Sequence, residues 1–290
     1  MIKEGIDPMP DPKQIPYLLK LLDDDSLSIQ KTIAKELTAF GPSLKEEVFR
    51  IRPTLNRKQK ELLLNILDVY NRELLKRSWS TWFEVKGDKE KLEAAFHLLA
   101  EFQCGLKLDV SLKTLLDELA QEYQATKIKK DAYGLCYFLF QIKEFKGAEK
   151  DYYNSQNSNL VHVLTEKRGL PISLVCIFML VGARCGFEIE GCNFPGHFLA
   201  RIELNGKKVL VDCFNKGKIL DEDEAIELNA DHSEIVHDVL HVNTSAETII
   251  TRVLGNLIQA YEQVEKFENS QLMKELLNTL EFSGLRSKSR

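Results

Sequence analysis

Apolar residues recur at every third or fourth position through much of the first 75 residues, which is the spacing of one face of an α-helix. Three aspartates and Ser26 separate the first two such stretches and provide a turn with a helix cap. Gly41-Pro42 ends the second stretch. This part of the chain is therefore predicted to contain helices and no strand, with helices at 15–22, 27–40 and 58–75 and a short one after Ser43.

The helical spacing is interrupted around residues 76–82, which contain both tryptophans of the chain. We place a domain boundary there, at about residue 80. The preceding segment, 1–80, resembles a single HEAT-type repeat, although a plain helical extension explains the same pattern. Beyond the boundary, three further helices are predicted at 88–104, 111–124 and 131–140.

The pattern changes after Asp151, where a polar, turn-rich stretch leads to a strongly apolar helix and then to strands. Pro171 suits the first position of a helix and Gly186 the residue that closes one, so the apolar helix is expected between them. Because it is apolar nearly all round, this helix should be buried on most sides. A buried helix on an antiparallel sheet is an α+β core. The strands are predicted at 188–194, 197–204 and 207–214.

From Ser245 onward the helical spacing returns. Two helices, 246–262 and 267–281, form a predicted hairpin similar to one tetratricopeptide unit. The chain is thus expected to have three parts. They are a helical, HEAT-like extension over 1–80, an α+β core over 81–244, and a helical hairpin with a tail over 245–290.

The strongest local signal is Asn205-Gly206, because both central residues of a type I′ turn need a positive φ. Counting outward from this turn places Leu199 opposite Asp212. His197 shares a face with Leu199, so His197 and Asp212 become diagonal neighbours roughly 7–8 Å apart at Cα. A carboxylate at that distance reaches an imidazole, which predicts the orienting half of a nucleophile-His-Asp triad.

Composition narrows the possible functions. With 290 residues, 29% charged and 44% hydrophobic, the chain is typical of a globular protein with a sizeable core. A net charge of −5 and no basic stripe argue against nucleic acid as a partner. The start has no apolar core of a signal peptide, and the longest apolar run, 170–183, is too short to cross a bilayer. We therefore expect a cytoplasmic protein with no membrane contact.

Six cysteines are scattered without a C-x-x-C pair, so we interpret them as free thiols in a reducing compartment. The spacing supports no metal site, and nothing in the chain indicates a cofactor. His237 and His241 stand four residues apart, but no third ligand is in view, and we interpret the pair as structural or surface residues.

Several separate motifs, in the same order, resemble the SirB-type transglutaminase-like family of bacterial proteins. The matching stretches are Lys150–Asn154, Asn157–Leu160, Arg168–Leu174, Pro195–Leu199 and Val211–Asn215. The resemblance covers roughly residues 90 to 283, including the tetratricopeptide-like hairpin. It implies a papain-like transglutaminase core, in which a cysteine at the start of a buried helix is served by a His and an Asp on adjacent strands.

The chain departs from active transglutaminase-like enzymes where the nucleophile belongs. Active members place a cysteine at the helix start, where the helix dipole lowers the pKa of the thiol. Here that region is Leu170–Ser173, with Ser173 in the first turn and Cys176 three residues further. Either residue is a candidate nucleophile. The alternatives are a first-turn hydroxyl that satisfies backbone donors for Ser173 and a small buried hydrophobe for Cys176.

Two functions of different classes fit these residues. In the first, the core is degenerate or non-catalytic and, with its flanking helical units, forms a scaffold for a protein partner. In the second, the protein is a papain-like acyl-transfer or amide-hydrolysing enzyme acting on a peptide substrate, with Cys176 or Ser173 as nucleophile, His197 as base and Asp212 as orienter. We place the scaffold slightly ahead. The sequence gives no oligomeric state.

Overall fold

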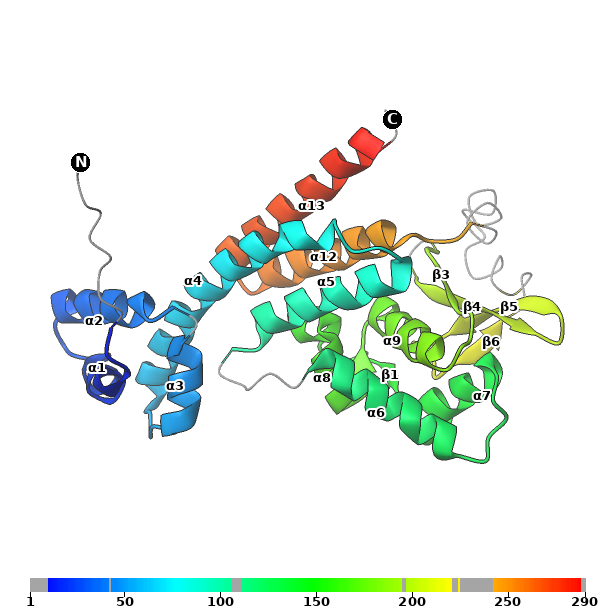
Figure 1. Cartoon of the computed structure of the whole chain (residues 1–290), viewed down its shortest axis with the longest axis horizontal. Helices are drawn as coiled ribbons and strands as arrows, with labels where there is room; N and C mark the ends of the chain where they lie inside the picture. Colours follow the sequence, from blue (N-terminus) through cyan, green and yellow to red (C-terminus); the bar gives the residue numbers. More distant parts are fainter. Residues whose placement is uncertain are drawn as a thin grey trace. The chain divides into compact units, whose positions relative to one another are not determined.

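A computed structural model describes residues 10–41, 43–105, 111–194, 197–220, 224 and 242–287 of the chain, the last seven in backbone only (Figure 1). The chain divides into two compact units. Unit 1 comprises residues 1–77 and 101–109, and unit 2 comprises residues 78–100 and 110–290. The division falls inside two helices, α4 (Arg57–Trp82) and α5 (Asp88–Gln103). The three-part division at residues 80 and 244 stays a prediction.

Unit 1 is helical. A 3₁₀ turn (η1, Pro12–Gln14) leads into α1 (Ile15–Leu21), α2 (Leu27–Ala39) and α3 (Ser43–Ile51), and the first part of α4 completes the unit. Their apolar faces meet in one core, and no strand occurs among the described residues between 15 and 75, as predicted. The innermost members of that core are Ile15, Leu19, Leu37, Leu44 and Leu63.

The predicted end of the fourth helix at residue 75 is wrong, because α4 continues without interruption to Trp82. Trp79 and Trp82 stand three residues apart, so they lie on one face of the helix. Both are almost fully buried, and their rings stack at 5.6 Å. Burial of the two indoles on one face stabilises the helix through residues 76–82. The polar residues of this stretch had suggested a break.

Unit 2 is built around α9 (Pro171–Arg184). Every residue from Pro171 to Gly182 is buried, which confirms the helix that was expected to be covered on most sides. It packs against α6 (Leu112–Ala125), α7 (Ala132–Tyr137), α8 (Leu160–Glu166) and the sheet. A short π-helical segment, η2 (Phe138–Ile142), extends α7.

A four-stranded antiparallel sheet flanks α9, with strands in the order β3-β4-β5-β6 (Figure 1). The bounds are Glu190–Cys192 for β3, Leu199–Leu204 for β4, Lys207–Asp212 for β5 and Lys218–Leu220 for β6. A separate parallel pair joins β1 (Lys146–Gly147) to β2 (Arg168–Gly169). The α+β class is therefore confirmed, whereas β6 and the parallel pair were not predicted.

The central hairpin has the predicted register. Asn205 and Gly206 have φ values of 52° and 75°, and the pairing runs from Leu204 opposite Lys207 to Ala200 opposite Val211. The predicted start of the strand at His197 is wrong. The strand begins at Leu199, and the backbone N–H of His197 instead donates to the carbonyl oxygen of Phe194 at 3.2 Å.

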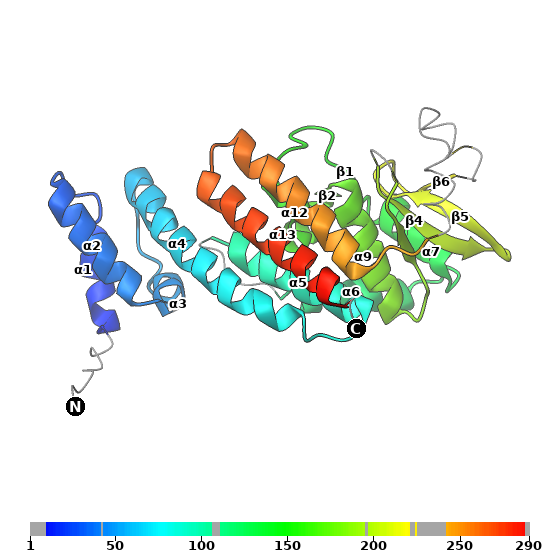
Figure 2. The ribbon, with the colours of Figure 1, turned by 90° about the horizontal axis from the view of Figure 1, so that it is seen from above.

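Two helices near the end of the chain, α12 (Ala246–Gln263) and α13 (Phe267–Ser287), lie side by side as the predicted hairpin (Figure 2). The first of them also packs against η3 (Ser155–Ser158), the 3₁₀ turn that precedes α8. Of the helices in the described part of the chain, none is long and apolar enough to span a bilayer.

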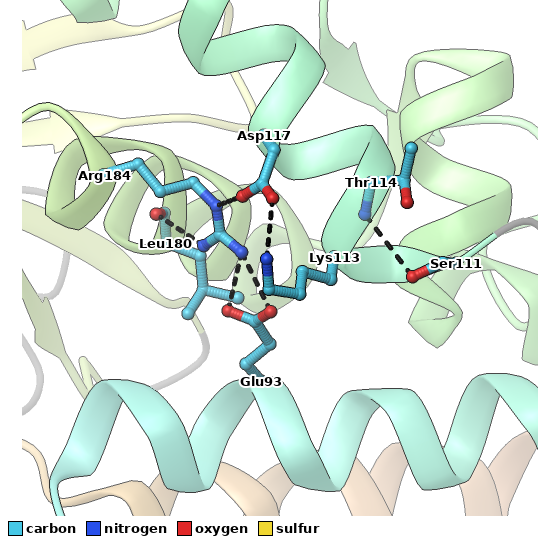
Figure 3. Close-up of polar contacts among 7 residues, drawn as sticks. All are labelled: Glu93, Ser111, Lys113, Thr114, Asp117, Leu180 and Arg184. Atoms are coloured by element: carbon cyan, nitrogen blue, oxygen red, sulfur yellow. Dashed lines mark hydrogen bonds and ion pairs between the residues drawn. The ribbon is translucent and has the colours of Figure 1, made fainter.

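Arg184, in the last turn of α9, ties that helix to α5 and α6 (Figure 3). Its Nη2 donates to both carboxylate oxygens of Glu93, each at 2.8 Å, and its Nε donates to Oδ1 of Asp117 at 2.6 Å. The Arg184 side chain is 17% exposed, and charge-assisted bonds of this kind are among the stronger polar contacts in proteins. The ion pairs thus fix the helix that carries both candidate nucleophiles.

Candidate functional site

His197 and Asp212 form the hydrogen bond that the hairpin register predicted. The imidazole Nε2 lies 2.9 Å from Oδ1 of Asp212. The Asp212 side chain is 5% exposed, whereas the His197 side chain is 23% exposed. The carboxylate is therefore buried behind an imidazole that keeps one side open to solvent, as in a base with its orienting acid.

Asn215 holds the carboxylate from the other side. Its backbone N–H donates to Oδ1 of Asp212 at 3.1 Å, and its side-chain Nδ2 donates to Oδ2 at 2.7 Å. Burial raises the pKa of Asp212, but the hydrogen bonds from His197 and Asn215 outweigh it and hold this pKa below its ordinary value. The spacing of residues does not predict these two bonds, because they depend on how the loop after β5 folds back.

Aromatic rings cover the dyad. The ring of Phe214 meets the His197 imidazole edge to face at 6.1 Å, and Tyr152 meets Phe214 at 6.2 Å. Phe214 in turn lies against Gly147, where an added Cβ would come within 2.4 Å of the ring. The absence of a side chain at Gly147 thus makes the space in which Phe214 packs beside His197.

Cys176 lies inside the core. It is 0% exposed, and burial raises the pKa of its thiol far above the ordinary value. The charged group that acts on it is Lys89, whose Nζ donates to the carbonyl oxygen of Ile189 at 2.7 Å. A thiol in this setting lacks the exposure and the lowered pKa that an active thiolate needs.

Ser173 is also fully buried, and its hydroxyl is engaged. Its Oγ donates to the carbonyl oxygen of Asn157 at 2.8 Å, which ties the first turn of α9 to η3. The same carbonyl accepts the backbone N–H of Leu170 at 3.2 Å. The hydroxyl thus has a structural role, but it differs from the expected one, because Ser173 satisfies a backbone acceptor of η3 and not the backbone donors at the start of its own helix.

Two other cysteines near the dyad in sequence are equally enclosed. Cys192 packs in a small apolar cluster with Phe194 and Leu199, and burial raises the pKa of its thiol to about 11. Cys192 is therefore no more available to a substrate than Cys176. Cys213 is 0% exposed, and burial raises the pKa of its thiol well above the ordinary value.

The described residues hold no group of three or more His, Cys, Asp and Glu side chains that could bind a metal ion. His237 and His241 lie outside the described residues.

Arg252 on α12 adjoins the segment that leads to His197, and sequence reasoning missed it. Its Nη1 donates to Oδ1 of Asn193 at 2.6 Å and to the carbonyl oxygen of Phe194 at 3.1 Å. The same carbonyl accepts the backbone N–H of His197. The only signal in the sequence is a single cation beside the apolar run Val253-Leu254.

Comparisons with known proteins find relatives of this chain. The chain is 31% identical over 144 residues to a UPF0162 protein of Xylella fastidiosa, an alignment that spans 46% of this chain and 50% of that protein. It is 30% identical over 153 residues to F-box only protein 21 of Mus musculus, which spans 50% of this chain and 24% of that protein. The chain thus spans about half the length, or less, of these relatives. No solved structure matches it. Residues 107–255, just over half of the chain, match the family model of the transglutaminase-like superfamily. The chain therefore belongs to that superfamily.

Proposed function

We propose that this chain is a SirB-type transglutaminase-like protein whose core is non-catalytic and serves, with its helical parts, as a scaffold for a protein partner in the cytoplasm. One observation carries the proposal: neither candidate nucleophile is available. Cys176 is buried with a raised thiol pKa, and the Ser173 hydroxyl is bonded to a backbone carbonyl. A triad works only when its nucleophile reaches both the base and the substrate.

A groove in unit 1 supports the interaction part of the proposal. It lies between α2 and α4 and encloses about 420 Å³. Leu27 and Val69 line it and are 70% and 46% exposed. The charged residues that line the groove, Lys31 and Lys35, are both basic. We assign it to an amphipathic helix of a partner that carries carboxylates beside an apolar stripe, since apolar grooves commonly take such helices.

An assay of amide chemistry tests the core. The intact protein is incubated with casein, whose glutamine side chains are the acyl donor with release of ammonia, and with a dansylated alkylamine as acyl acceptor, alongside the Cys176→Ala and His197→Ala variants. We expect the wild type to incorporate no more label than either variant. Label incorporated by the wild type and lost in His197→Ala would overturn the proposal.

A designed peptide tests the groove. The probe is a helical peptide with a leucine stripe flanked by glutamates, and its match has lysines in place of the glutamates. We expect the acidic peptide to bind more tightly, and the Lys31→Glu and Lys35→Glu double variant to weaken it at least tenfold. A Lys13→Glu and Lys60→Glu double variant, with the same charge change outside the groove, should bind as the wild type does. Equal binding of both peptides would refute the assignment.

The second candidate is an acyl-transfer or amide-hydrolysing enzyme, favoured by the His197-Asp212 pair that Asn215 completes. In that case His197 would take the proton of a nucleophile as it attacks an amide carbonyl, and would return the proton to the leaving amine. The amide assay separates the scaffold from an acyl-transfer enzyme, because only an enzyme loses label incorporation when His197 is replaced.

A further inference from the structure

Arg252 has no acidic partner among the residues that the structure describes. The guanidinium is partly buried, and its hydrogen bonds go to two neutral acceptors, the side chain of Asn193 and the carbonyl of Phe194. Its other face lies over the ring of Phe198 at 5.6 Å. Among the described residues no carboxylate pairs with it. By contrast, two other arginines of unit 2, Arg184 and Arg201, each bind a glutamate.

The guanidinium has donors to spare. An arginine presents five N–H groups in a fixed fork, and the two bonds of Arg252 use Nη1 alone. Burial without a counter-charge also lowers the pKa of Arg252, although a guanidinium stays protonated at neutral pH. Leaving a partly buried cation unpaired is costly, so a site that retains one gains stability when an anion arrives.

The position of Arg252 links it to the dyad. The Phe194 carbonyl accepts from both the guanidinium of Arg252 and the backbone N–H of His197, so the two residues are joined through one oxygen. The ring of Tyr152 meets Phe214 beside His197, and the charge of Arg252 acts on the phenol of Tyr152 by opposing the rise in its pKa that burial causes. Tyr152 is 38% exposed, so this side of the site is open to solvent.

We infer that Arg252 binds a carboxylate of a peptide ligand whose backbone lies beside His197. Planar guanidinium groups bind carboxylates through two parallel bonds, which gives both affinity and orientation. The carboxylate belongs either to the end of a chain or to an acidic side chain. The inference goes beyond the proposed function, since it holds for a catalytic core and for a non-catalytic one alike.

Three small probes test the site on the full chain. N-acetylglutamine amide is neutral, N-acetylglutamine carries its charge at the chain end, and N-acetylglutamate amide carries it on the side chain. Dissociation constants are measured by NMR titration, with the Nε–Hε signal of Arg252 as the direct readout. We expect one of the charged probes to bind at least tenfold more tightly than the neutral one, and the tighter of the two identifies the source of the carboxylate.

Variants make the assignment specific. Arg252→Gln should reduce the preference for the charged probe to less than twofold, Arg252→Lys should keep part of it, and Arg57→Gln, the same change at an exposed residue of unit 1, should leave it intact. His197→Ala should also keep the preference for the charged probe, which would show that the preference does not depend on catalysis. If Arg252→Gln does not fold, the wild-type protein provides the test, because the Nε–Hε signal of Arg252 should shift when the charged probe binds. No preference in the wild type, or a preference that survives in folded Arg252→Gln, overturns the inference.

Discussion

At the scale of single residues, the candidate site depends on a carboxylate that is kept charged inside the protein. Asp212 accepts from His197 and twice from Asn215. These bonds lower its pKa below the ordinary value of 3.8, so the charged form is the one that the fold stabilises. Such a group contributes stability above the pKa of the unfolded chain and loses it as the pH falls through the pKa of the folded state.

We therefore expect Asp212→Asn to lower the free energy of unfolding at pH 7 by about 1–3 kcal/mol, the usual cost of weakening buried hydrogen bonds to a charge. The difference from wild type should shrink as the pH falls below about 4. Urea unfolding of both proteins between pH 2.5 and 7 measures this difference in the free energy of unfolding. A difference that stays constant down to pH 2.5 would contradict the assignment of the charge to Asp212.

The cysteines provide a second prediction at this scale. Cys104 and Cys185 are partly exposed, whereas the other four cysteines are buried, namely Cys136, Cys176, Cys192 and Cys213. Iodoacetamide at neutral pH should therefore label Cys104 and Cys185 before the other four, because only an accessible thiolate reacts. Peptide mass spectrometry after short exposures gives the order.

Replacement of the buried candidate nucleophile, Cys176→Ala, complements the labelling experiment. It should cost about 1–2 kcal/mol of stability, from the small cavity that the lost sulfur leaves, and leave any activity largely intact. First labelling at Cys176, together with its loss in His197→Ala, would reverse the interpretation and favour a papain-like enzyme.

At the scale of elements, two glycines have different surroundings, so substitution by alanine should have opposite effects on stability at the two positions. Gly147 in β1 lies against the ring of Phe214, so the methyl group of Gly147→Ala would overlap that ring and should cost about 1–3 kcal/mol. Gly255 lies within α12 with nothing within 4 Å of an added Cβ. Gly255→Ala should therefore stabilise the protein by about 0.5–1 kcal/mol. Thermal unfolding of both variants checks the pair, and destabilisation by Gly255→Ala would show that its surroundings are not open.

The elements that local chemistry determines were predictable from the sequence. Asn205-Gly206 fixed both turn and register, because few other pairs tolerate two positive φ values, and the register carried Asp212 to His197. Pro171 likewise marked the start of α9. Features that depend on tertiary contacts were not predictable. The extension of α4 needs the burial of Trp82, and the bonds of Arg252 join residues almost 60 positions apart.

The state of the candidate nucleophiles was left open for a related reason. Helical spacing places Ser173 and Cys176 on one face near the helix start, but it does not say what that face meets. The structure places Asn157 against the hydroxyl and Lys89 beside the thiol, both from segments distant in sequence. A chain can thus keep the order of the family's motifs while the group that would attack lies in the core.

At the scale of the whole molecule, each unit has a hydrophobic core of its own. The core of unit 1 draws on α1 to α4, and the core of unit 2 surrounds α9 and the sheet. Units with separate cores unfold as separate cooperative blocks when few buried contacts are shared. The candidate groove belongs to unit 1, and the dyad with Arg252 belongs to unit 2.

A substitution in one core should therefore leave the site in the other unit intact. Leu37 is 0% exposed in the core of unit 1, so Leu37→Ala should destabilise that unit by about 2–5 kcal/mol. Hydrogen exchange followed by mass spectrometry should show faster exchange in α1 to α3 and unchanged protection in α9 and β4. Leu199→Ala, at an equally buried position of β4, is the reciprocal control and should loosen unit 2 while leaving α1 to α3 protected. Equal loss of protection in both units after either substitution would mean that the chain unfolds as one block, and that binding at the groove and binding at Arg252 share one folding equilibrium.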